Sequence, residues 1–221
     1  MQKPLVFGIA GLVVGLFLGF WGANSINRTS SLSAAPAGSG TVPFNGIANG
    51  GNMPEADIQE VLDQAQNEPK NFAVQMRTGD MYAQIGRFAE AVEFYKRGLA
   101  VRPEDRQGNL VLANAYFDAR MFKEAVEQYR KVLSLTPDDN NARADLAGSL
   151  IEADPPDYDA AIVEVETVLK ADPKHEASLY YLGIALSRKG EKEKASEALK
   201  RLEEANPANP LITRLRQNIE S

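Results

Sequence analysis

Five prolines set a period along this chain. Pro69, Pro103, Pro137, Pro173 and Pro207 follow one another at intervals of 34, 34, 36 and 34 residues. An alanine recurs within each interval, and an aromatic or aliphatic residue stands four positions later: Ala91 and Tyr95, Ala125 and Tyr129, Ala161 and Val165, Ala195 and Leu199. A self-similar period of this length indicates an array of stacked structural repeats.

Each interval predicts two helices. Small residues recur on the first helix, at Gly79, Ala113, Ala147 and Gly183, and the recurring alanines lie on the second, so the pair can approach closely. Glycines at 86 and 190 suit the turn between the two helices because glycine tolerates a positive φ. Each proline is followed by Asp, Asn or Glu residues that favour the start of the next helix. The two extra residues of the third interval fall in a proline-rich loop at 154–157, where we expect a longer turn.

The clearest interval, residues 106–137, resembles the tetratricopeptide repeat (TPR). Leu112-Ala113, Tyr116, Ala125, Tyr129 and Pro137 match the family's leucine-small pair, tyrosine, alanine, aromatic residue and proline. The resemblance extends over residues 72–207, although the third and fourth intervals lack both tyrosines. It implies an all-α solenoid of antiparallel helix pairs that binds a segment of another protein.

The repeats form one part of a five-part chain. We expect a transmembrane anchor at 1–23, a flexible linker at 24–53, a half-repeat capping helix at 54–68, four TPR units at 69–208 and a C-terminal capping helix at 209–221. The linker is rich in Ser, Ala, Gly, Asn and Pro, which is typical of disordered tethers.

Residues 4–23 carry no charge, and a helix of this length spans roughly 30 Å, enough to cross a bilayer. Lys3 before this segment and Arg28 after it give a slight positive-inside bias toward a cytoplasmic N-terminus. We therefore expect a single-pass protein of a bacterial inner membrane with periplasmic repeats. A signal peptide cleaved after Ser25 is the alternative.

Three glycines of this segment, Gly11, Gly15 and Gly19, lie four residues apart on one helix face. Two overlapping GxxxG patterns allow close packing of membrane helices, which would support a homo-oligomer or docking on another membrane helix. The alternative is that glycine is simply common in such helices.

Charge and composition exclude several functions. The net charge is −6, and every acidic residue lies at or after Glu55, so the repeats offer no basic surface for nucleic acid. The chain has no cysteine and one histidine, His175, which we expect at the surface, so we predict neither a metal site nor a cofactor. No nucleotide-binding or catalytic motif occurs, and we expect no enzymatic activity and no catalytic residues.

The resemblance also implies which residues face the concave groove, at positions 2, 5, 9, 12 and 13 of each unit. The basic clamp of chaperone-binding TPR domains is absent, and the apolar members favour an amphipathic helix or an extended apolar peptide. The predicted groove consists of Met76, Asp80, Gln84, Gln107, Leu110, Asn114, Phe117, Asn141, Ile151, Tyr180, Ile184 and Arg188.

These observations predict a membrane-tethered adaptor or assembly chaperone whose groove holds part of another protein, with the bilayer contacted through residues 4–23. Two alternatives stay open. The repeats can bind one another as a self-assembling scaffold, or the chain can be a secreted, soluble TPR binder.

Overall fold

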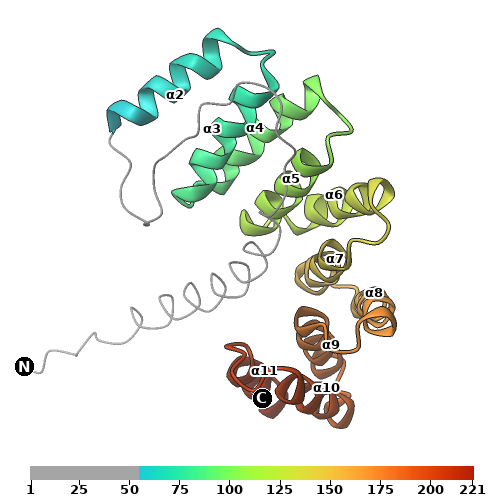
Figure 1. Cartoon of the computed structure of the whole chain (residues 1–221). Coiled ribbons are helices and arrows are strands. Elements are labelled where there is room, and N and C mark those ends of the chain that lie inside the picture. Colours follow the sequence, from blue (N-terminus) through green and yellow to red (C-terminus); the bar gives the residue numbers. More distant parts are fainter. Residues whose placement is uncertain (1–54) are drawn as a thin grey trace, which may run out of the picture.

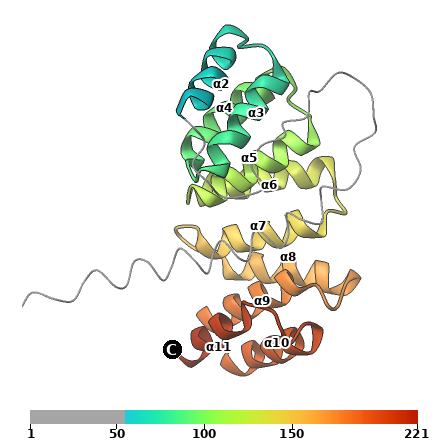
Figure 2. The ribbon, with the colours of Figure 1, turned by 60° about the vertical axis from the view of Figure 1, so that its left-hand side comes forward.

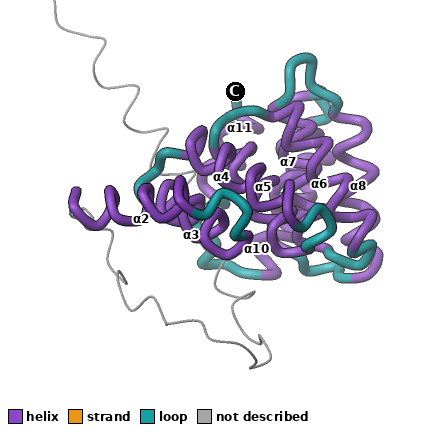
Figure 3. The backbone as a smooth tube through the Cα atoms, turned by 90° about the horizontal axis from the view of Figure 1, so that it is seen from above, coloured by secondary structure: helices purple, strands orange, loops and turns teal. Residues whose placement is uncertain are grey.

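The computed structural model describes residues 55–221, with side chains from residue 58 onwards, and this part of the chain is all α (Figure 1). Tubes of helix joined by short turns account for all of it (Figure 3). The helices are α2 (Glu55–Asn67), α3 (Phe72–Gln84), α4 (Phe88–Val101), α5 (Arg106–Asp118), α6 (Phe122–Leu135), α7 (Asn140–Glu152), α8 (Tyr158–Ala171), α9 (Glu176–Arg188), α10 (Lys192–Ala205) and α11 (Ile212–Glu220).

The predicted capping after each proline is confirmed for α3, α5 and α7. The side chains of Asn71, Asp105 and Asp139 accept hydrogen bonds from backbone N–H groups in the first turn of these helices. Such bonds satisfy donors that have no partner inside the helix. The fourth unit differs, because His175 and not an acidic or amide residue caps α9.

The turn between paired helices needs a left-handed residue. Gly86 and Gly190 adopt φ values of 76° and 81°, as the sequence predicts, and Arg120 adopts 61° at the equivalent place in the second unit. In the third unit, α7 and α8 are joined by residues 153–157, which is the predicted longer turn.

The helix pairs stack into an arc. The first helices of the four pairs, α3, α5, α7 and α9, follow its inner side, and their partners α4, α6, α8 and α10 follow its outer side (Figure 1). From another side the pairs form successive layers between α2 and α11 (Figure 2). This arrangement gives the inner surface one helix from each unit.

The buried apolar side chains form two clusters. One joins α2, α3, α4 and part of α5, and the other runs from α5 to α11. The half-buried Tyr116 on α5 packs against both clusters and so connects them. The array therefore buries a nearly continuous core, as stacked repeats require.

Both ends of the array are capped by a single helix. Val61 and Ala65 of α2 are buried against the first unit, and the buried Gln75 donates from Nε2 to the carbonyls of Ala65 (2.8 Å) and Glu68 (3.1 Å). These bonds occupy carbonyls at the C-terminal end of α2, which have no partner within that helix.

At the other end, Ile212, Leu215 and Ile219 of α11 are buried. The capping helix predicted at 209–221 is shorter in the structure, where α11 begins at Ile212. Asn209 accepts a hydrogen bond from the N–H of Leu211 (2.8 Å), so a turn precedes the helix. Asn and Asp side chains often hold such turns, which compete with helix at the N-terminus.

The predicted anchor at 1–23, its three glycines and the linker at 24–53 lie outside the described residues. Within residues 55–221, no helix is both long enough and apolar enough to cross a membrane.

Candidate functional site

Two buried tyrosines fix polar groups on the inner side of the first two units. Tyr95 of α4 donates to Oδ1 of Asp80 on α3, and Tyr129 of α6 donates to Oδ1 of Asn114 on α5, both at 2.7 Å. The tyrosines are 3% and 2% exposed, so their hydroxyls require partners inside the protein. In each of the first two units, a buried tyrosine therefore orients one predicted groove residue.

The last two units fill these positions with apolar contacts. The places of Asp80 and Asn114 are taken by Gly148 and Ile184, and those of the tyrosines by Val165 and Leu199. The ring of Tyr181 lies against Gly148 so closely that a Cβ there would be 2.7 Å from its Cζ. Burial raises the pKa of Tyr181 well above its ordinary value, so this phenol stays protonated at neutral pH.

The capping helix α11 packs directly on α9. A Cβ added to Gly183 would lie 2.7 Å from Leu215 of α11, which shows how near the two helices come. Tyr180, Ile184 and Leu215 belong to one buried cluster. The fourth unit therefore presents little of its predicted groove to solvent.

Burial divides the predicted groove into three groups. The exposed residues are Asp80, Gln84, Gln107 and Arg188; the half-buried ones are Met76, Leu110, Asn114 and Asn141; the buried ones are Phe117, Ile151, Tyr180 and Ile184. Most of the large apolar side chains are thus core residues. The accessible inner face is more polar than the sequence suggested.

Arg188 forms an ion pair and does not stand alone as a groove cation. Its guanidinium lies 2.9 Å from Oε1 of Glu152 and donates to the carbonyl of Ile151 (3.3 Å). The pair joins the last turns of α7 and α9, so opposite charges face each other across two units. This part of the inner face carries no net charge from the pair.

Sequence reasoning missed the role of His175, which is half-buried and not a free surface residue. Its Nδ1 accepts a hydrogen bond from the N–H of Ser178 (3.3 Å), and its Nε2 lies 3.0 Å from Oδ1 of the predicted groove residue Asn141. Burial is the main cause that lowers the pKa of His175, and the carboxylates of Asp172 and Glu176 oppose it.

A second missed feature recurs near the turns that join the units. Asn109 donates to the carbonyl of Pro103 (2.9 Å) and accepts from Gln128 (2.7 Å). At the equivalent places, Arg143 donates to the carbonyl of Pro137 (2.9 Å) and to Glu164 (2.7 Å). The spacing of 34 residues between Asn109 and Arg143 was the signal that could have found these pairs.

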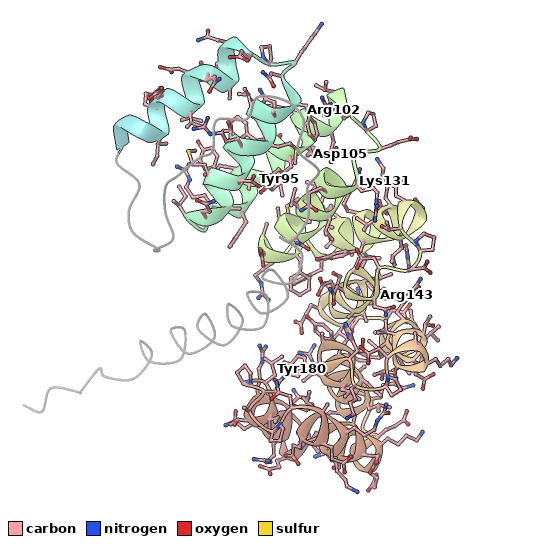
Figure 4. All side chains as sticks on the ribbon, in the orientation of Figure 1. Tyr95, Arg102, Asp105, Lys131, Arg143 and Tyr180 are labelled. Atoms are coloured by element: carbon pink, nitrogen blue, oxygen red, sulfur yellow. The ribbon has the colours of Figure 1, made fainter. Side chains whose placement is uncertain are left out.

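Figure 4 shows several of these side chains together. Tyr95 lies between α3 and α4, and Tyr180 lies on the inner side of the arc. Arg102, at the end of α4, is near the α4–α5 turn, and its guanidinium lies 4.7 Å from the ring centre of Phe72. This cation–π contact joins the end of α4 to the start of α3.

Two surface depressions at the turns contain none of the predicted groove residues. One of about 590 Å³ is lined by residues 67–72, Val101 and Arg102, and another of about 450 Å³ by residues 102–105. Among the described residues, no group of His, Asp and Glu has the arrangement of a metal site. Neither depression extends the candidate site on the inner face.

Family models and solved structures agree on the fold. A tetratricopeptide repeat model matches residues 55–109 and 110–166, and a second tetratricopeptide repeat model matches residues 156–219. The chain belongs to the tetratricopeptide repeat family. No curated protein sequence matches it.

Two solved proteins illustrate the structural similarity. MamA from Desulfovibrio magneticus RS-1 is 18% identical, with a TM-score of 0.62 over 71% of this chain and 87% of that one. YrrB, described as a TPR protein with an unusual peptide-binding site, is 13% identical, with a TM-score of 0.53 over 73% and 88%. At these identities the similarity shows the fold.

Proposed function

We propose that this protein is a membrane-tethered adaptor or assembly chaperone that binds a peptide or helix of another protein on the inner face of its TPR arc. TPR proteins are generally interaction modules without enzymatic activity, and YrrB has a peptide-binding site on the same fold. The apolar, uncharged sequence at 4–23 supports the membrane tether, and the charges around it favour periplasmic repeats in a bacterial inner membrane.

The observation that carries the proposal is the fixed polar group at the centre of the inner face. Tyr129 holds Oδ1 of Asn114, which leaves the Nδ2 donor of this amide without a partner among the described residues. Extended peptides and irregular segments bring main-chain carbonyls that need such donors. The half-buried Met76 and Leu110 stand at the position-5 sites of units one and two, where apolar side chains of a partner can pack.

The capped ends distinguish this proposal from a scaffold built by end-to-end stacking. Gln59, Asp63 and Gln64 on α2 are exposed, and so are Arg216 and Gln217 on α11. Terminal repeats with a polar outer face stop an array from extending. Contact between copies would therefore need another surface.

Photo-crosslinking in the full-length protein in its native membranes tests the proposal. Probes at the exposed Gln84 and Gln107 report on the inner face, and probes at the exposed Lys123 and Glu197 on α6 and α10 are the controls. We expect one partner protein to be captured from both inner sites and from neither control. Asn114→Ala should reduce its capture about fivefold, because loss of one hydrogen bond costs about 1 kcal/mol.

Other outcomes of this experiment would contradict the proposed function or support one of its alternatives. Adducts only between copies of the chain would make the inner face an assembly surface and support the scaffold. Equal capture from all four sites would contradict a specific inner-face site. A mature protein that is free of the membrane and begins at Ile26 would support the secreted binder.

A further inference from the structure

His175 occupies a position that Asn or Asp occupies at the first three units. It precedes α9, and its Nδ1 accepts from the backbone N–H of Ser178 at 3.3 Å. The hydroxyl of Ser178 also lies 2.9 Å from Nδ1. A carboxylate or amide oxygen accepts hydrogen bonds across the neutral pH range, whereas an imidazole nitrogen accepts only when it carries no proton.

The same ring joins two units. Its Nε2 lies 3.0 Å from Oδ1 of Asn141, which stands 34 residues earlier on α7. At the three equivalent positions, the capping residues are Asn71, Asp105 and Asp139. Within residues 58–221, none of these three side chains bonds to the first helix of the preceding unit. His175 is therefore both the cap of α9 and a bridge across the seam between the third and fourth units.

The contacts define the neutral tautomer. The backbone N–H of Ser178 can only donate, so Nδ1 is the acceptor and Nε2 carries the hydrogen that it donates to Asn141. Ser178 is 0% exposed, so its N–H has no access to water if this acceptor is lost. An orphaned buried donor costs free energy comparable to a lost hydrogen bond.

The charged groups around the ring oppose the effect of burial on its pKa. Asp172, in the turn before α9, and Glu176, its first residue, favour the protonated ring, while Asn141 faces it from α7 as a neutral amide. Glu176 already accepts hydrogen bonds from the amides of Asn206 (2.9 Å) and Asn209 (2.6 Å). Burial outweighs both carboxylates, so the pKa of His175 lies below its ordinary value of 6.5.

We propose that His175 is a pH-dependent latch on the first turn of α9, the helix that begins the fourth TPR unit. A proton on Nδ1 turns this acceptor into a donor, which removes the cap from Ser178. It also places a positive charge beside the positive end of the α9 dipole. The first turn of α9 then loosens, while the Nε2–H group stays bonded to Asn141 of α7.

The direction of the pH effect follows from the lowered pKa. The stabilisation is fully present above the ordinary histidine pKa, and it is lost as the pH falls through the lower pKa of the folded protein. The latch does not depend on what the inner face binds, so its test is separate from that of the proposed function.

Because the sequence contains one histidine, the imidazole signals of the full-length protein belong to His175 alone. A titration followed by nuclear magnetic resonance should give a midpoint below 6.5. Hydrogen exchange then measures the latch through the amide of Ser178, compared with that of Gly108, which Asp105 caps in the second unit.

After correction for intrinsic rates, the protection of Ser178 relative to Gly108 should fall about fivefold between about pH 7.5 and about pH 5, the size of an ordinary cap contribution. His175→Asn keeps a neutral acceptor at the cap, so its ratio should stay constant. A constant ratio in the unaltered protein, or an equal fall in H175N, would overturn the latch. A titration midpoint at or above 6.5 would overturn it even if H175N did not fold.

Discussion

The first two TPR units and the last two share one backbone plan but fill the space between paired helices differently. In the first two, the buried hydroxyls of Tyr95 and Tyr129 are bonded to Asp80 and Asn114. In the last two, the tyrosines are replaced by Val165 and Leu199, which are smaller and have no donor. The comparison shows that the repeat requires a filled interior, while polar groups enter it as hydrogen-bonded pairs.

In the last two units, side chains from the next element along the array pack against glycines of the first helices. The third unit places Gly148 where the first two have Asp80 and Asn114, and the ring of Tyr181 from the next unit lies over it. In the fourth unit, Leu215 of the capping helix lies over Gly183. Neighbouring units pack on one another in both halves, but among the described helices it is in the second half that two first helices, α7 and α9, also pack on each other.

The largest effect should come from the apolar half. Leu179, on α9, is 0% exposed and occupies the position of Asn109 and Arg143 in earlier units. Leu179→Ala should lower the free energy of unfolding by about 2–5 kcal/mol, because it leaves a cavity in the core. Urea denaturation measures this loss, and Val163→Ala, at a side chain that is 62% exposed, is the control. A loss below that of the control would contradict the close packing.

Smaller losses of stability are expected when the hydroxyls of the two tyrosines in the first two units are removed, and the two losses should differ. Tyr95→Phe removes a bond to a carboxylate and should cost about 1.5–3 kcal/mol, while Tyr129→Phe removes one to an amide and should cost about 0.5–1.5 kcal/mol. Urea midpoints of the two variants give the order directly. Equal losses would show that the charge of Asp80 adds nothing to this bond.

The side-chain pair near the turn of the third unit can be replaced by the equivalent pair of the second unit. Arg143→Asn alone should cost about 1 kcal/mol because it removes a hydrogen-bonded pair with Glu164. The double variant R143N/E164Q reproduces the chemistry of Asn109 and Gln128 and should recover to within about 0.5 kcal/mol of the unaltered protein. Thermal unfolding of both single variants and of the double variant measures the coupling, and additive losses would argue against equivalence.

The smallest effect is expected at Arg188, whose ion pair with Glu152 is partly exposed. Arg188→Ala should change stability by less than about 1 kcal/mol, since exposed pairs contribute little. The stabilities of Arg188→Ala and Glu152→Ala, each measured in low and in high salt, show how far salt screens this ion pair. A loss above about 2 kcal/mol would show that the pair supports the seam between α7 and α9.

Local patterns predicted the glycine turns and most of the caps because the causes of these features are local. Small residues, capping residues and glycines at 86 and 190 act within a few positions of the chain, and the structure shows these turns as expected. The late start of α11 was the exception. There Asn209 bonds to Leu211 and to Glu176, and the second contact lies 33 residues away.

The inner face could be predicted only in part. The TPR pattern names positions, and three of these, Gln84, Gln107 and Asp80, are exposed to solvent. It does not state which neighbour covers a position. Tyr180 and Ile184 are buried in a core that includes residues of α11, so a helix outside the repeat pattern changes what the fourth unit exposes.

By itself, the sequence determined that this chain is an array of TPR helix pairs, because a period of 34 residues with matched small and large positions admits few other folds. Only the tertiary structure decided which inner residues meet solvent and what His175 contacts. These properties depend on side chains brought together from neighbouring units, with Asn141 and His175 separated by 34 residues. Burial and hydrogen bonding across a seam are set by the stacking of the units, which no single segment of the sequence specifies.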